Sequence, residues 1–194
     1  MAGSTARVML VSPAVGADLR AARFGGDAPP DAAGLRAATG AAAALPAADR
    51  HLAGPSARCT ATAGALGLRA RETGELADLD PGRWRGRRLE EVAAEDPAAV
   101  AQWLADPAAA PHGGESVLDL CARVAGWLDG EAVVGGRVLA VVEPAVVRAA
   151  VVRALGLPAA VFWRLDVAPL TVTELTGRAG RWNLRCGRPL PVES

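Results

Sequence analysis

The chain has 194 residues, of which 51% are hydrophobic, and its 21 basic and 21 acidic side chains give a formal net charge of zero. This composition excludes a disordered chain, and the zero net charge argues against a general affinity for nucleic acid or for an anionic membrane. No apolar run reaches the roughly 18 residues that a membrane helix needs. The first expected strand begins at residue 7, too early to follow a cleavable signal peptide, so we expect a cytoplasmic protein with a single domain over residues 1–194.

Strand and helix signals alternate along the chain, as is typical of an α/β layered domain. The first half predicts a strand at 7–12, a helix at 31–45, a short strand at 50–54 and a helix at 56–67. Asp31 and Ser56 stand where the N-caps of the two helices are needed, and Gly67 closes the second helix.

The second half continues the alternation and ends in two strands. It predicts short helices at 88–96 and 97–106, a helix at 114–130, a strand at 136–143, a helix at 144–156 and strands at 168–176 and 180–187. The run at 136–143 is continuously apolar, which indicates a central strand buried on both faces. Pro144 follows it at the favoured first position of a helix. We expect the last two strands to form a hairpin at a sheet edge.

Basic and sulfur-containing residues limit the available chemistry. All 21 basic residues are arginine, so no Schiff-base lysine and no phosphate-loop lysine is present, and the arginine and alanine excess is typical of a GC-rich bacterium. Cys59, Cys121 and Cys186 have neither a disulfide pattern nor zinc-site spacing. We expect no metal and no cofactor. Cys59 follows Arg58 near a helix start, where a thiolate is stabilised, although a small buried residue is the commoner role. The five tryptophans are expected to serve packing rather than ligand stacking.

Six segments follow one another in the order and spacing of the motifs of a known enzyme family. They are ARFGGDAPPDAAGLRAA (22–38), GPSARCTATAGALGL (54–68), ELADLDPGRWRGRRLEEV (75–92), PHGGESVLDLCARVAGWL (111–128), RVLAVVEPAVVRAAVVRALGLP (137–158) and FWRLDVAPLTVTEL (162–175). On these segments the chain resembles the histidine phosphatase superfamily over almost its whole length. The resemblance implies a phosphoglycerate mutase-like fold, a three-layer α/β/α sandwich with a mostly parallel central sheet.

The resemblance also implies a degenerate active site. In the family, an Arg-His-Gly at the end of the first strand supplies the histidine that accepts the phosphoryl group, and a second histidine follows the central strand. Carried over residue by residue, Ser12, Pro13 and Ala14 stand in place of the Arg-His-Gly. Glu143 and Pro144 stand in place of the second histidine and the glycine after it. Both catalytic histidines are therefore expected to be missing.

Other family positions keep a polar group. The resemblance places Arg58 at the second phosphate-binding arginine and Asp78 at the proton donor, where the family has a glutamate. The chain contains only two histidines, His51 and His112, and neither follows the first or the central strand. The loop that carries His112 lies at the pocket rim in the family, so this residue is either a rim group or a solvent-facing loop histidine. Arg23 is a second expected rim group.

Three functions stay open. The first is a catalytically inactive pseudophosphatase that binds an unknown small molecule or protein partner, because the first arginine and both histidines of the family site are lost together. With both carboxylates ionised, Arg58 facing Asp78 and Glu143 also gives a net negative pocket that repels phosphate. The second is a repurposed enzyme in which Glu143 and Asp78 act as an acid/base pair beside Arg58. The third is residual phosphatase or phosphomutase activity on a small phosphate ester, through an unforeseen nucleophile such as Ser12. A sealed pocket filled by an Arg58–Glu143 ion pair would favour the first, and an open cleft with separated carboxylates the second. We expect a monomer or a homodimer with no nucleic-acid or membrane partner.

Overall fold

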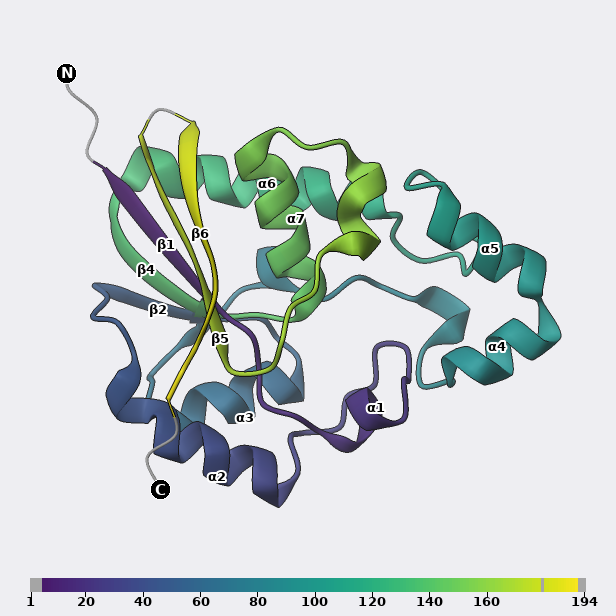
Figure 1. Cartoon of the computed structure of the whole chain (residues 1–194), viewed down its shortest axis with the longest axis horizontal. Helices are drawn as coiled ribbons and strands as arrows, with labels where there is room; N and C mark the ends of the chain where they lie inside the picture. The colour runs from purple at the N-terminus through teal and green to yellow at the C-terminus, as the bar shows by residue number, and fades with distance from the viewer. Residues whose placement is uncertain (1–4, 179, 192–194) are drawn as a thin grey trace.

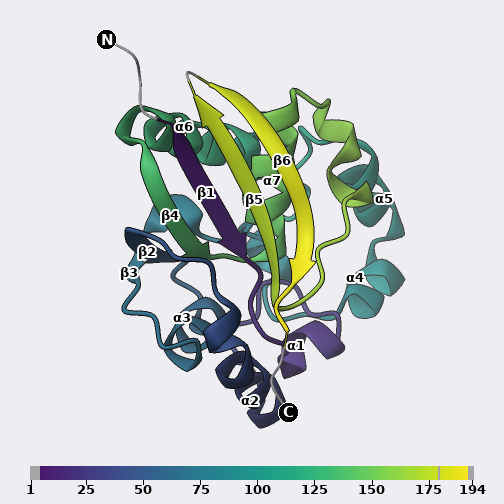
Figure 2. The same ribbon diagram turned by 60° about the vertical axis from the view of Figure 1, so that its left-hand side comes forward.

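A six-stranded sheet forms the centre of the computed structural model, which describes residues 5–178 and 180–191 (Figure 1). The strand order is β3-β2-β4-β1-β5-β6. The strands are β1 (Ala6–Val11), β2 (Arg50–Ala53), β3 (Arg71–Glu72), β4 (Gly136–Val141), β5 (Thr171–Arg178) and β6 (Arg181–Pro189). The first four in this order run parallel, and β5 and β6 are antiparallel additions. The β5–β6 hairpin ends the sheet at one edge, as predicted (Figure 2).

Helices cover both faces of the sheet, which confirms the three-layer α/β/α fold. One face packs against α6 (Val117–Val134) and α7 (Pro144–Leu155), and the other against α2 (Ala32–Ala41) and α3 (Ala57–Ala65) (Figure 1).

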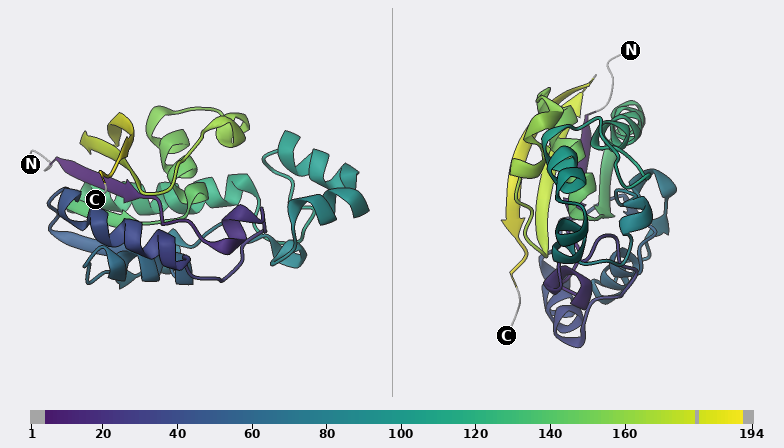
Figure 3. Two further views of the ribbon diagram at one scale, coloured as in Figure 1. Left: turned by 60° about the horizontal axis from the view of Figure 1, so that its bottom comes forward. Right: turned by 90° about the vertical axis from the view of Figure 1, so that its right-hand side faces the viewer.

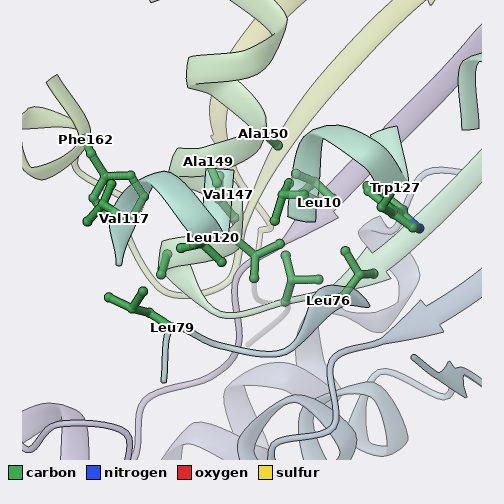
Figure 4. Close-up of a cluster of buried hydrophobic side chains, with 14 of the residues drawn as sticks. Leu10, Leu76, Leu79, Val117, Leu120, Trp127, Val147, Ala149, Ala150 and Phe162 are labelled. Carbon is green, nitrogen blue, oxygen red and sulfur yellow. The ribbon is translucent and has the colours of Figure 1, made fainter. Parts of the chain in front are cut away.

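Strand alternation explains why β1 is apolar throughout. Leu10 points to the core under α6 and α7, in the same cluster as Leu120 and Phe162 (Figure 4), whereas Met9 points to the core on the opposite face. A strand with a hydrophobic core on each side has an unbroken run of apolar residues in its sequence.

The predicted helix starts are confirmed by their caps, with one correction. The Asp31 carboxylate accepts a hydrogen bond from the Gly34 N–H at 2.7 Å, and Ser56 Oγ accepts one from the Cys59 N–H at 3.1 Å. The expected start of α6 at residue 114 is wrong, because Ser116 is its N-cap.

A smaller group of helices lies at one end of the molecule. Figures 1 and 3 place α4 (Leu89–Glu95) and α5 (Pro97–Ala105) there, beyond the four-residue α1 (Ala17–Arg20). The break between α4 and α5 falls at Pro97, as predicted. Within residues 5–178 and 180–191, no helix has both the length and the apolar character needed to cross a membrane.

Candidate functional site

A cavity of about 240 Å³, open on one side, lies where the loops after β1 and β4 meet the start of α3. Its lining combines three arginines with three carboxylates and an aromatic wall. The carboxyl ends of parallel strands are where open α/β sheets build ligand sites. The cavity therefore lies where the family resemblance places a site.

Arg58 and Glu143 form an ion pair in the cavity wall. Arg58 Nε donates to Glu143 Oε1 at 3.2 Å, and Nη2 donates to Oε2. Ser56 Oγ also donates to Glu143 Oε1, at 2.8 Å. The side chains of Arg58 and Glu143 are only 11% and 9% exposed. The structure thus combines the ion pair that would favour the pseudophosphatase with the open cavity that would favour the repurposed enzyme.

Asp78 lies beside this pair on the loop before α4 and lines the same cavity. Desolvation, followed by the negative charge of Glu143, raises the pKa of Asp78 from its usual 3.8 to about 7. The nearby arginines 58 and 123 oppose this rise only partly. At neutral pH the carboxyl therefore exchanges between a hydrogen-bond donor and an anion.

The turn after β1 contributes no reactive group to the cavity. Ser12 is 1% exposed; its hydroxyl donates to the Ala168 carbonyl and accepts from the Thr171 N–H at 3.1 Å. Pro13 is buried and, like Ser12, is not part of the cavity lining. Ala14 is fully buried, and its N–H donates a hydrogen bond to Thr62 Oγ1 at 3.1 Å.

Both expected rim residues line the cavity, but His112 is not a surface group. It is 2% exposed, its Nδ1 accepts the Gly114 N–H at 3.0 Å, and its ring packs 5.0 Å from that of Trp84. The alternative of a solvent-facing histidine is wrong, and burial lowers the pKa of His112. Arg23 donates to the Gly86 carbonyl at 2.8 Å.

Cys59 is an inert buried residue, and the alternative of a stabilised thiolate is wrong. Its Sγ lies 3.7 Å from Glu143 Oε1, and desolvation together with that negative charge raises the pKa of the thiol well above its usual value. In the described part of the chain, no three His, Cys, Asp or Glu side chains cluster in a way that could hold a metal ion.

The sequence matches the family model described as histidine phosphatase superfamily (branch 1) over residues 18–187. The chain belongs to this superfamily. Among curated proteins, no sequence matches it.

Solved histidine phosphatase-like structures superpose on nearly the whole chain. A mycobacterial glucosyl-3-phosphoglycerate phosphatase has a TM-score of 0.83 and 23% identity, over 95% of this chain and 99% of its own. The α-ribazole phosphatase from Shigella flexneri has a TM-score of 0.82 and 22% identity, over 97% and 100%. A mutant phosphoserine phosphatase from Entamoeba histolytica, in complex with phosphoserine, has a TM-score of 0.83 and 15% identity, over 94% and 96%. At these identities the likeness concerns the fold alone.

In this member of the histidine phosphatase superfamily, sequence reasoning misses two charged groups of the cavity. Arg148 and Asp18 both line it, so three arginines face three carboxylates and the expected net negative pocket is wrong. Arg148 has a usable signal, since it follows Pro144 by four residues and shares its helix face. Asp18 has none, because it lies in a helix of four residues. The aromatic wall of Phe24 and two tryptophans is a further feature that the expectation of tryptophan packing does not include.

Proposed function

We propose that this member of the histidine phosphatase superfamily is a pseudophosphatase, a binding protein that does not form a phosphohistidine. The observation that carries the proposal is Glu143 bound to Arg58. A guanidinium whose Nε and Nη2 already bind a carboxylate has fewer donors left for phosphate oxygens. Glu143 repels each phosphate charge about 5 Å away by roughly 3 kcal/mol at an effective dielectric of 20, which offsets the attraction that Arg58 would otherwise provide.

The turn after β1 supports the same proposal. Covalent phosphoryl transfer needs a nucleophile that reaches phosphorus, activated by a neighbouring base. Pro13 carries no nucleophilic atom, and the Ser12 hydroxyl is directed at the Ala168 carbonyl rather than lining the cavity. Neither residue can replace a phosphoryl-accepting histidine in this arrangement.

A second candidate function is favoured by Asp78. A carboxyl group with a pKa of about 7 has the value that suits a general acid or base at neutral pH. In this alternative, Asp78 and Glu143 transfer protons to and from a substrate beside Arg58. Turnover of a non-phosphorylated substrate that Asp78→Asn abolishes, while ligand binding is kept, would favour the enzyme over the pseudophosphatase.

Hydrolysis of p-nitrophenyl phosphate tests the pseudophosphatase proposal. The parent protein is compared with the double variant His51→Ala/His112→Ala, which removes both histidines of the chain. We expect no hydrolysis above the buffer rate in either protein. Hydrolysis by the parent that the double variant loses would overturn the proposal. The cytoplasmic location, single-domain organisation, lack of a cofactor and monomeric or homodimeric state stay predictions.

A further inference from the structure

Arg148 differs from the other two arginines of the cavity in having no carboxylate partner within 4 Å among the described residues. Arg58 is paired with Glu143, and Arg23 Nε lies 3.9 Å from Asp18 Oδ1. Asp166 and Asp78 act on Arg148 only through longer-range attraction. Among the described residues, Arg148 is therefore the cavity arginine with no direct carboxylate contact to compete with an anion from solution.

The local structure holds the Arg148 guanidinium in place and leaves its outer end open. Nε donates to the Leu165 carbonyl at 2.7 Å, and the guanidinium carbon lies 5.8 Å from the ring centres of Phe162 and Trp163. Neither Nη1 nor Nη2 donates a hydrogen bond to a described residue, and neither is among the fully buried nitrogens. Two parallel N–H donors on a fixed guanidinium match the two oxygens of a carboxylate.

Aromatic rings continue from Arg148 along the cavity wall. Trp163 lies 4.3 Å from Trp103 between ring centres, and Trp103 lies 5.5 Å from Phe24. All three line the cavity. Ligand sites combine such apolar walls with a few polar groups that fix orientation. The wall fits a flat apolar body whose charged end reaches Arg148.

Volume and charge limit the size and ionisation of that ligand. A cavity of about 150 Å³ lined by apolar side chains holds benzene, so about 240 Å³ has room for one ring and a carboxylate. With Arg58 paired to Glu143, Arg23 beside Asp18 and the Asp78 carboxyl protonated below pH 7, one cationic group is left over, which matches a single negative charge. A phosphate dianion carries a second charge that no further unpaired cavity arginine balances.

We propose that this cavity binds a small aromatic carboxylate, with its two oxygens on Arg148 and its ring against Phe24, Trp103 and Trp163. The inference rests on the proposed binding function and adds the ligand class.

Asp78 supports this choice of ligand, because its carboxyl is largely protonated below pH 7 and then does not repel an anion. The ionisable groups that act on it or feel its charge are Glu143, Arg58, Arg123, Arg148 and Cys59. Of these, the three arginines favour its ionised form and Glu143 opposes it. Binding should therefore weaken as the pH rises through 7.

Calorimetric titration with benzoate at pH 6 tests the proposal. We expect the parent protein to bind benzoate, and Arg148→Gln to weaken binding about tenfold or more through loss of a charged hydrogen-bonding pair. The matched control is Arg153→Gln, on the same helix but paired with the exposed Asp129, and should bind like the parent. Benzyl alcohol, with a similar ring and no charge, should bind about tenfold more weakly than benzoate.

Several outcomes separate this inference from the function on which it rests. No benzoate binding by the folded parent, or equal binding by Arg148→Gln with a parent-like circular dichroism spectrum, would overturn the ligand class. Trp163→Ala should also weaken benzoate binding, and unchanged affinity would overturn the placement of the ring. If phenyl phosphate binds more tightly than benzoate but is not hydrolysed, the proposed carboxylate ligand class is refuted and the proposed pseudophosphatase function still stands. Phenyl phosphate hydrolysis that depends on a histidine would refute the pseudophosphatase instead.

Discussion

Removing the Glu143 side chain should destabilise the protein strongly, because it leaves the nearly buried Arg58 guanidinium without its carboxylate partner. Breaking a buried ion pair from one side costs about 3–5 kcal/mol. Arg58 is 11% exposed and borders an open cavity through which water can approach, so we expect Glu143→Ala to lie near the lower end, at about 3 kcal/mol. Glu143→Gln keeps an acceptor for Ser56 Oγ and for Arg58 Nε, and should cost about 1–2 kcal/mol.

Urea denaturation of the parent and variants measures these differences, provided that the dependence on urea concentration is unchanged. Asp129→Ala is the matched control, since Asp129 pairs with Arg153 through side chains that are 46% and 39% exposed. Such an exposed pair contributes about 0–1 kcal/mol. If Glu143→Ala is no more destabilising than Asp129→Ala, then the Arg58–Glu143 pair is solvated and the argument from burial fails.

Three further predictions concern the groups around this pair. Asp78 keeps its proton up to about pH 7 in the folded protein but loses it near pH 3.8 in the unfolded chain, so the free energy of unfolding falls as the pH rises between these values. Asp78→Asn should therefore stabilise the protein at pH 8, by at most about 4 kcal/mol, and change its stability little at pH 4. Urea denaturation at both pH values measures the difference. Ser12→Ala removes the hydroxyl oxygen that accepts the Thr171 N–H at 3.1 Å, and should lower the free energy of unfolding by about 1–3 kcal/mol in the same assay. An unchanged unfolding midpoint would contradict a contribution from this buried hydrogen bond. Glu143→Gln removes a negative charge beside Arg58 and should bind inorganic phosphate about a hundredfold more tightly by calorimetry, whereas equal or weaker binding would contradict the proposed repulsion.

The sequence predicts those helices and strands that are determined by residues close together in the chain. The run at 136–143 and Pro144 predict β4 and α7, because a strand buried on both faces is uniformly apolar and proline suits the first helical position. Asp31 and Ser56 predict two helix starts through hydrogen bonds within one turn. The missed elements, α1 and β3, have four and two residues, too few for a periodic pattern.

The candidate site is predicted only where family motifs mark it. The pairing of Arg58 with Glu143 follows from two motif positions, each placed after a strand. The burial of His112 does not follow, since it depends on Trp84 and on a turn that gives its ring the Gly114 N–H. The role of Arg148 depends on which carboxylates the other arginines bind, and sequence spacing holds no such information.

Transfer of a phosphoryl group to the protein tests the central claim most directly. The parent protein is incubated with a phosphate donor such as acetyl phosphate and then analysed by intact mass spectrometry at neutral pH, where phosphohistidine survives. The account predicts an unmodified mass, because Pro13 and Glu143 leave the ends of β1 and β4 without a phosphoryl acceptor. An added phosphoryl group that is lost in acid, and that His51→Ala/His112→Ala prevents, would contradict it.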